Sequence, residues 1–246
     1  MLLKILITVL TLGAASSAWS TEKVTVGFGD ALAPWAIPAT NNGILVDIIT
    51  EALEPAGYEI VPIYYPYLRR IIEYRKDFVD VICDINVNTM EDQKLPGFLS
   101  DDAYDYENFA FALKEKGYQF KHLNDLGNVA LLSWKGATAH LGDEYFKMAT
   151  NNPLYFETNN QESQIKMLFH KRVDVVQLDK RIFGYYRSKA EQEGLVDTTS
   201  EVDSFPLFGS SSNGFLFHDE KIRNDFNRGL KVLKESGRYA EILKAY

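Results

Sequence analysis

The sequence predicts an α/β protein of two lobes, each a mainly parallel sheet flanked by helices, and two observations predict it. Strand-like and helix-like stretches alternate along the chain, which is the pattern of a parallel sheet covered by helices. Nearly the same phrase also occurs twice, as FVDVICD at 78–84 and as RVDVVQLD at 172–179. Each copy follows a helix-like stretch and runs into an apolar strand that ends on an aspartate. The two copies are therefore expected to occupy equivalent places in the two lobes.

The first 20 residues are expected to be a secretory signal peptide that precedes the fold. Lys4 is followed by an apolar run at 5–12 and by small residues at 13–18, which is the layout of such signals. The run is shorter than the roughly 20 residues that span a bilayer. A buried first helix is the alternative. No cysteine stands at the end of the run, so we expect an exported, soluble protein without a lipid anchor.

The next elements alternate between the two kinds of periodicity. A strand is expected at 23–29, where valines alternate before a glycine turn. Apolar residues then recur at helical spacing from position 43, and Pro55 and Gly57 end that helix. A strand at 58–65, a helix at 66–77 and a strand at 78–88 follow. Pro66 marks the start of the second helix, and its apolar face is expected to consist of Leu68, Ile71 and Ile72.

The same alternation starts again after a mixed region. The expected elements are a strand at 128–134, a turn and helix at 135–150, a strand at 154–159, a helix at 161–172, a strand at 173–179, a helix at 180–194, two strand-like stretches and a closing helical run. The chain is expected to cross between the lobes near 108–114 and again near 203–210. Lobe I then comprises 21–110 and 208–246, and lobe II comprises 111–207.

The two aspartates of each repeated phrase are expected to have different roles. Asp80 and Asp174 lie where a helix–strand loop meets the strand, at the edge far from a ligand, and turn chemistry explains them. Asp84 and Asp179 lie late in the same strands. Ligands of open α/β sheets gather beyond the carboxyl ends of the strands. Asp84 and Asp179 are therefore candidate residues of a groove between the lobes.

Composition excludes several classes of function. The net charge is −8, and the lysines and arginines are scattered, which disfavours nucleic-acid binding. Cys83 is the only cysteine, so no internal disulfide forms, and a small core residue is the simplest interpretation. The four histidines are isolated and lack metal-ligand spacing. We expect no metal and no cofactor, and no set of residues requires catalysis.

Long stretches of the chain resemble one protein family. They read VTVGFGDALAPWAIP, NGILVDIITEAL, VDVICDINVNTMED and RVDVVQLD, and the chain closes on IRNDFNRGLKVLKESGRYAEILKAY. Their order and spacing are similar to those of the bacterial extracellular solute-binding proteins of family 3, the polar amino-acid-binding type. The resemblance implies a periplasmic, two-lobed clamshell of the type II binding-protein fold, which closes on a small solute and delivers it to an ABC permease of the inner membrane. It also implies a monomer.

The chain departs from the family pattern where the family binds a carboxylate. The family usually has Thr-x-x-Arg after the third strand, and a planar guanidinium matches two carboxylate oxygens. Here the stretch is TMED, which keeps Thr89 and places Asp92 at the arginine position. Asp84, Asn86 and Asn88 alternate just before it and are expected on one face of the strand, where the family has small residues.

The missing arginine leaves two interpretations of the ligand. In the first, Arg69 or Arg70 at the helix start binds the carboxylate in its place, and Arg69 is the preferred candidate. A solvated helix residue is the alternative for Arg69. In the second, the ligand is an amine or a neutral polar solute. Asp179 matches the family acid that takes the ligand ammonium, and it is also a candidate N-cap for the following helix.

Three further residues are candidate ligand contacts. Trp35 lies in a proline-fixed loop where the resemblance implies an aromatic that covers the ligand, and Tyr67 is a similar candidate. Aromatic faces offer apolar contact and can meet a cation, although core packing is the alternative for both. In lobe II, Thr138 follows a glycine turn at a helix start, where backbone N–H groups can bind an anion.

The predicted function is therefore solute capture without catalysis. One alternative is a solute receptor for a sensor protein that works without a permease. A second alternative is a periplasmic dehydratase that acts on a cyclic carboxylate, because some proteins with this fold are enzymes. Such an enzyme would need a basic cleft, whereas the aspartates above predict an acidic one.

Overall fold

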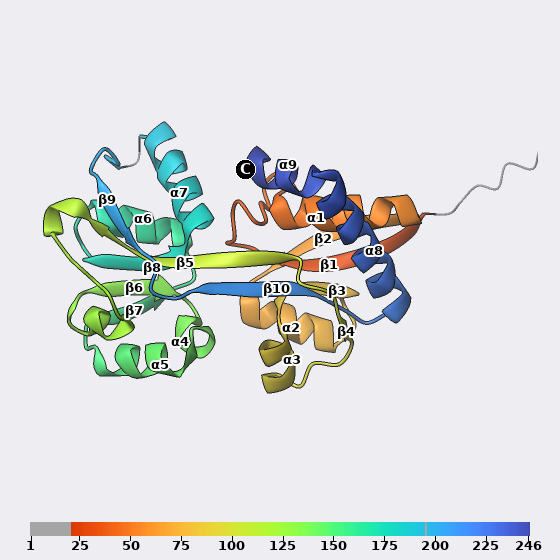
Figure 1. Cartoon of the computed structure of the whole chain (residues 1–246), viewed down its shortest axis with the longest axis horizontal. Helices are drawn as coiled ribbons and strands as arrows, with labels where there is room; N and C mark the ends of the chain where they lie inside the picture. Colours follow the sequence, from red (N-terminus) through yellow and green to blue (C-terminus); the bar gives the residue numbers. More distant parts are fainter. Residues whose placement is uncertain (1–20, 195) are drawn as a thin grey trace, which may run out of the picture.

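The computed structural model describes residues 21–194 and 196–246. The expected signal peptide at 1–20 lies outside these residues. Figure 1 shows two lobes side by side, joined by two long strands, β5 (Tyr104–Leu113) and β10 (Ser210–Phe217). The predicted class, two α/β lobes, is confirmed.

Lobe I contains the first half of the predicted alternation. Its strands are β1 (Glu22–Gly29), β2 (Tyr58–Tyr65), β3 (Val81–Ile85), the short β4 (Phe98–Leu99) and part of β10. Strands β2, β1 and β3 are parallel neighbours in that order, and β10 pairs with β3 in the antiparallel direction. Eight of the ten strands form one continuous path through both lobes, with β10 and β5 as its central pair, and β4 and β9 pair with β10 and β5 beside that path.

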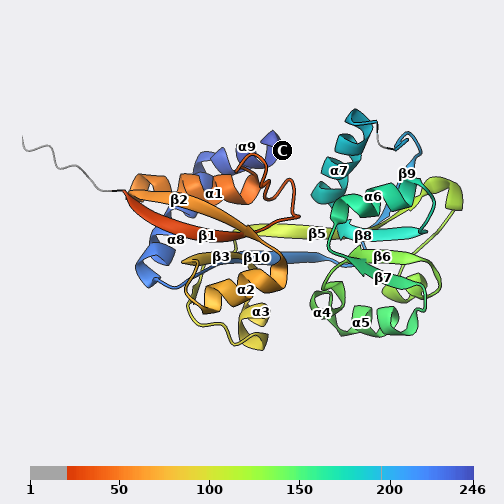
Figure 2. The same ribbon diagram turned by 180° about the vertical axis from the view of Figure 1, so that it is seen from behind.

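Helices cover both faces of the lobe I sheet. The helices are α1 (Ile44–Leu53), the 3₁₀ turn η1 (Glu54–Ala56), α2 (Tyr67–Arg75), α3 (Val87–Asp92), α8 (Glu220–Ser236) and α9 (Arg238–Ala245). Figures 1 and 2 show α1, α8 and α9 on one side and α2 and α3 on the other. Helix α8 buries a stripe at helical spacing, Ile222, Phe226, Leu230 and Leu233. Gly229 of α8 packs directly against the backbone of Ala52. A Cβ at position 229 would lie 2.0 Å from the Ala52 carbonyl oxygen, so this close approach requires a glycine.

Lobe II repeats the arrangement with its own strands and helices. Its elements are the 3₁₀ helices η2 (Lys114–Lys116) and η3 (Leu123–Asn128), β6 (Leu131–Trp134), α4 (Ala137–His140), α5 (Gly142–Asn151), β7 (Tyr155–Thr158), α6 (Gln161–Phe169), β8 (Val175–Asp179), α7 (Lys180–Gln192) and β9 (Val202–Phe205). Strands β7, β6 and β8 are parallel neighbours. Figures 1 and 2 show α6 and α7 above this sheet and α4 and α5 below it.

The equivalence of the repeated phrases extends to their first aspartates. The Asp80 carboxylate accepts hydrogen bonds from the backbone N–H and the hydroxyl of Thr25, at 2.7 and 2.6 Å, just before β3. The Asp174 carboxylate accepts from the backbone N–H of Ala130 at 3.0 Å, just before β8. Each aspartate therefore ties its loop to the neighbouring parallel strand. The predicted turn chemistry is confirmed for both.

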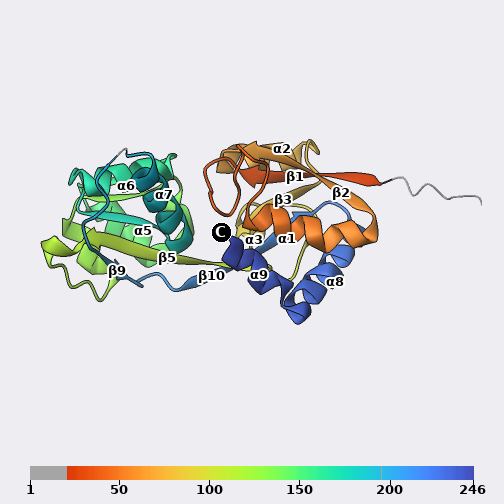
Figure 3. The same cartoon turned by 90° about the horizontal axis from the view of Figure 1, so that it is seen from above.

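Strand β5 changes partner where it crosses between the lobes. Its residues from Tyr104 to Glu107 pair with β10, and those from Asn108 to Ala112 pair with β8. The change takes place in one residue step, from Glu107 to Asn108, and Asn108 lies opposite Asp179. Figure 3 shows β5 and β10 running together along one side of the space between the lobes. The carboxyl end of β8 consequently lies at the crossing.

The third predicted strand, 78–88, is longer than the observed one. Strand β3 ends at Ile85, and Asn86 caps helix α3 by accepting from the Thr89 backbone N–H at 2.9 Å. Asp84 has a left-handed backbone with φ 61°. Asp84, Asn86 and Asn88 therefore do not alternate along one strand face, and this prediction was wrong. An asparagine side chain that bonds to nearby backbone favours a cap over a strand interior.

No helix among the described residues combines the length and the apolar character that a membrane crossing needs.

Candidate functional site

Three hydrogen bonds join the two lobes on the side of the 30–43 loop. The indole Nε1 of Trp35 donates to Oδ1 of Asp179 at 2.9 Å. Gln161 Nε2 donates to the Ala31 carbonyl at 3.1 Å, and an Arg181 guanidinium nitrogen donates to the Leu243 carbonyl at 2.8 Å. The lobes are therefore in contact in this structure, through α6 and α7 of lobe II.

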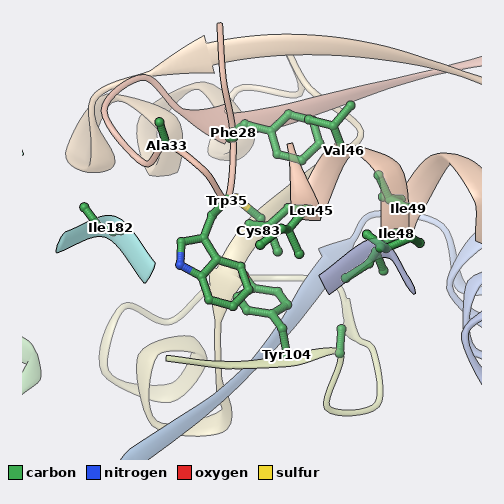
Figure 4. Packing of buried hydrophobic residues seen from close by; sticks show 14 of the residues in the cluster. Phe28, Ala33, Trp35, Leu45, Val46, Ile48, Ile49, Cys83, Tyr104 and Ile182 are labelled. Atoms are coloured by element: carbon green, nitrogen blue, oxygen red, sulfur yellow. The ribbon is translucent and has the colours of Figure 1, made fainter. Parts of the chain in front are cut away.

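Trp35 is held in place by its loop and by two tyrosines. Its ring centroid lies 5.6 Å from that of Tyr104 and 5.0 Å from that of Tyr106, and the residue is 2% exposed. The Leu45 backbone N–H donates to the Trp35 carbonyl at 2.8 Å, and a Cβ on Gly43, whose φ is 127°, would lie 2.8 Å from that carbonyl oxygen. Figure 4 shows the Trp35 indole nitrogen on the side where Ile182 of α7 lies. Trp35 thus belongs to the core and to the lobe interface at once.

Asp179 is the N-cap of α7 and the acceptor of four hydrogen bonds. Its Oδ1 accepts from Trp35 and from the backbone N–H groups of Arg181 and Ile182, while Oδ2 accepts from the Glu107 N–H at 2.9 Å. Burial raises the pKa of Asp179, and the hydrogen bonds oppose that rise. The structure therefore places the predicted cap at the junction of the two lobes.

Asp84 lies in a second buried network that sequence analysis assembled only in part. Its Oδ2 pairs with the Arg70 guanidinium at 2.7 Å, and its Oδ1 accepts from the hydroxyls of Tyr104 and Tyr106 at 2.8 and 2.6 Å. Arg70 also donates to the sulfur of Cys83 at 3.2 Å. Burial, followed by the charge of Asp84, raises the pKa of both tyrosines well above the usual value. Both hydroxyls therefore stay protonated and act as donors.

The structure places Arg70, and not the preferred Arg69, beside Asp84. Arg70 is 1% exposed, whereas the Arg69 side chain is 60% exposed and pairs with Glu73 on the same helix. The predicted apolar face of this helix was partly wrong, because Leu68 is 67% exposed and Ile72 is 42% exposed. The buried face of α2 contains Arg70, Ile71 and Tyr74. Neighbouring helical positions point about 100° apart, so Arg69 and Arg70 lie on different faces of α2.

Tyr67 meets lobe II through a histidine. The Tyr67 ring lies 5.3 Å from the Arg70 guanidinium carbon and packs edge-on against His140 of α4, with centroids 4.9 Å apart. His140 in turn stacks on Trp134, at 5.6 Å. Burial raises the pKa of Tyr67 to about 12 and lowers that of His140. Among the described residues, the buried Tyr67 hydroxyl has no hydrogen-bond partner.

The anion site expected at the lobe II turn is filled by a side chain of the protein. The Glu157 carboxylate accepts from the backbone N–H groups of Gly136 and Thr138, at 3.1 and 3.2 Å, and from the Thr138 hydroxyl at 3.0 Å. The Tyr155 hydroxyl adds a fourth bond at 2.9 Å. Burial alone would raise the pKa of Glu157, but these donors hold it below the usual value. Thr138 is therefore engaged with Glu157, which sequence analysis missed.

The remaining candidates lie apart from these contacts. Asn86 caps α3 and donates through Nδ2 to Asn213 Oδ1 at 3.3 Å. Asp92 is exposed at the last residue of α3. No group of three or more histidines, cysteines, aspartates or glutamates that could hold a metal ion occurs within the part of the chain that the structure describes.

Solved structures with the same fold include several ligand-binding proteins. The ligand-binding core of GluR0, in complex with L-glutamate, has a TM-score of 0.73 and 15% identity over 92% of this chain and 99% of that one. ArtJ of Geobacillus stearothermophilus, an arginine-, lysine- and histidine-binding protein, gives 0.69 and 18% over 92% and 95%. The ancestral amino-acid-binding protein AncCDT-1, a precursor of cyclohexadienyl dehydratase, gives 0.69 and 16% over 91% and 95%.

These comparisons bear on the fold. No protein-family model matches the chain, and no curated protein matches it. At 15 to 18% identity the likeness shows the two-lobed clamshell of the periplasmic binding proteins over nine-tenths of the chain. The predicted clamshell is therefore confirmed.

Proposed function

We propose that this chain is a periplasmic solute-binding protein that captures a small polar solute, an amino acid or a related amine, between its lobes. The observation that carries the proposal is the buried polar network at the junction of the lobes. At this junction, Trp35 of lobe I donates a hydrogen bond to Asp179 of lobe II. The Asp84 carboxylate accepts from Tyr104 and Tyr106, the two tyrosines whose rings pack near that of Trp35. Two proteins of this fold support it, since one is bound to L-glutamate and the other is named for binding three basic amino acids.

Closure of the lobes is the proposed mechanism. The Trp35–Asp179 hydrogen bond spans 144 residues of sequence and both lobes, so it exists only when the lobes meet. A ligand shifts the balance between open and closed forms only by its extra affinity for the closed form. A solute that contacts both Asp179 and the aromatic side chains of lobe I gains that extra affinity on closure. Delivery to an inner-membrane ABC permease is the proposed outcome.

A thermal-shift screen tests solute capture by the mature chain, 21–246. At 100 times its Kd, a ligand stabilises the folded state by about 2.7 kcal/mol. For a chain of this size we expect the Tm to rise by roughly 5–10 °C. The screen contains amino acids, amines and small carboxylic acids, and a specific rise must saturate with concentration. If no compound in these three classes raises the Tm, the proposed function is wrong.

Two other functions remain candidates on this fold. A receptor for a sensor protein would bind the same solute, so deletion of the gene would abolish the cellular response and leave solute uptake unchanged. The likeness to AncCDT-1 supports a dehydratase as the enzymatic candidate. Against it, the buried Arg70 is already paired with Asp84 and is not available to a cyclic carboxylate. Turnover of such a substrate by the purified chain would establish the enzyme.

A further inference from the structure

The Glu157 carboxylate occupies the anion-binding position at the lobe II turn. The turn between β6 and α4 presents the N–H groups of Gly136 and Thr138 and the Thr138 hydroxyl in one direction, and all three donate to the Glu157 carboxylate. Lys135 is the cation beside it, 3.5 Å from Oε2. The Glu157 side chain is 12% exposed. The donors that could hold the carboxylate of a solute are therefore already engaged.

In lobe I, Asp84 likewise engages the guanidinium of the buried Arg70, so this cation is not free to bind the carboxylate of a solute. Arg70 is the only arginine or lysine among the described residues that is less than 9% exposed, and its guanidinium pairs with Asp84 at 2.7 Å. Two tyrosine hydroxyls and the Asp84–Arg70 contact hold that carboxylate in place. Arg181, at the other side of the interface, donates to the Leu243 carbonyl and lies over the Trp35 ring, with its guanidinium carbon 5.8 Å from the ring centroid.

The side chains at the lobe junction that can still accept a hydrogen bond or offer a ring face are suited to binding a cation. Asp179 Oδ2 accepts a single hydrogen bond, from the Glu107 N–H, so a carboxylate oxygen retains acceptor capacity. Within residues 21–194 and 196–246, the buried Tyr67 hydroxyl makes no hydrogen bond, and aromatic rings of Trp35, Tyr67 and Trp134 lie on both sides of the lobe junction. An ammonium group can be held by a carboxylate and by ring faces together.

We infer that Glu157 and Asp84 occupy the positions where a solute carboxylate would bind, and that the ligand is an amine that carries no carboxylate. This inference rests on the proposed function and narrows its ligand class. A solute carboxylate would have to displace an internal acid or lie next to it, and like charges in a partly buried site repel. The corresponding amine avoids that repulsion and keeps its contact with Asp179.

Pairs of compounds that differ only by a carboxylate test the inference. Isothermal titration calorimetry on the mature chain compares agmatine with arginine, cadaverine with lysine, histamine with histidine and tyramine with tyrosine. We expect at least one amine to bind, and to bind at least tenfold more tightly than its amino acid. Replacing Glu157 with alanine removes the carboxylate that occupies the donors of the turn. The affinity for that amino acid is therefore expected to rise about tenfold, and the difference in affinity between the amine and its amino acid is expected to become smaller. The matched control is Glu201→Ala, because that side chain is 75% exposed and pairs with Lys114.

The outcomes separate the inference from the proposed function. If an amino acid binds wild type as tightly as its amine or more tightly, the inference is overturned and solute capture stands. If neither member of any pair binds and the wider screen is also empty, solute capture itself is overturned. If Glu157→Ala does not fold, as judged by circular dichroism, Glu157→Gln replaces it, and the wild-type preference within each pair decides the inference in either case.

Discussion

Replacing Arg70 with methionine is expected to destabilise the protein by about 3–5 kcal/mol, because the substitution leaves a buried carboxylate without its cation. Arg70 is 1% exposed, and Asp84, its partner at 2.7 Å, is 11% exposed. Typical domains are stable by only about 5–15 kcal/mol, so the loss is a large part of the whole. Urea denaturation of the two purified proteins measures the difference in free energy of unfolding.

An exposed cation at the end of the same helix provides the control for this prediction. Lys76→Met removes a positive charge from the C-terminus of α2, and Lys76 is exposed. We expect a change of at most about 0.5 kcal/mol, as for most exposed positions. The double variant Arg70→Met/Asp84→Asn removes both partners and is expected to recover part of the loss. Equal effects of Arg70→Met and Lys76→Met would contradict the buried pair.

Replacing Asp179 with alanine is expected to weaken both folding and ligand binding. The side chain caps α7 and accepts from Trp35 and Glu107 as well. Loss of a cap costs about 1 kcal/mol, and buried donors without partners add about 1–3 kcal/mol. The proposed hydrogen bond from a ligand ammonium to this carboxylate would be lost too, which is worth about 1.5–3 kcal/mol or roughly 10- to 100-fold in Kd. Urea denaturation and calorimetry with the best ligand measure the two effects.

A second helix cap separates the role of Asp179 in capping from its role at the interface. Asp219 is the N-cap of α8 and accepts from the Ile222 N–H at 3.0 Å, and it is exposed. Asp219→Ala is expected to cost about 1 kcal/mol of stability and to leave the Kd unchanged. If both alanine variants bind the ligand as wild type does, Asp179 does not contact the ligand.

The architecture was predictable because it depends on local patterns. The strand expected at 58–65 is observed over the same residues, and the closing stripe of α8 is buried as its spacing indicates. The two Val-Asp-Val phrases identified equivalent strands, since each begins with an aspartate that binds the neighbouring strand. Asp179 could be predicted as a cap and as a residue of the lobe junction from its place at the end of such a strand.

The parts of the site that sequence analysis missed depend on distant partners. Arg70 is buried and pairs with Asp84, 14 positions away, whereas the apolar Leu68 and Ile72 are exposed against the usual pattern. Glu157 reaches the turn because β6 and β7 are parallel in a register that aligns Ser133 with Glu157. Local periodicity carries no information on either pairing. The overlong third strand has a local cause, since Asn86 caps a helix within an apolar stretch.

Small-angle X-ray scattering of residues 21–246, with and without a ligand from the screen, tests the central claim most directly. The claim is that a solute brings together the two lobes that Trp35 and Asp179 join in this structure. We predict a smaller radius of gyration when the ligand saturates the protein, and no such change in Asp179→Ala at the same ligand concentration. A ligand that binds wild type by calorimetry and leaves the radius of gyration unchanged would contradict the account.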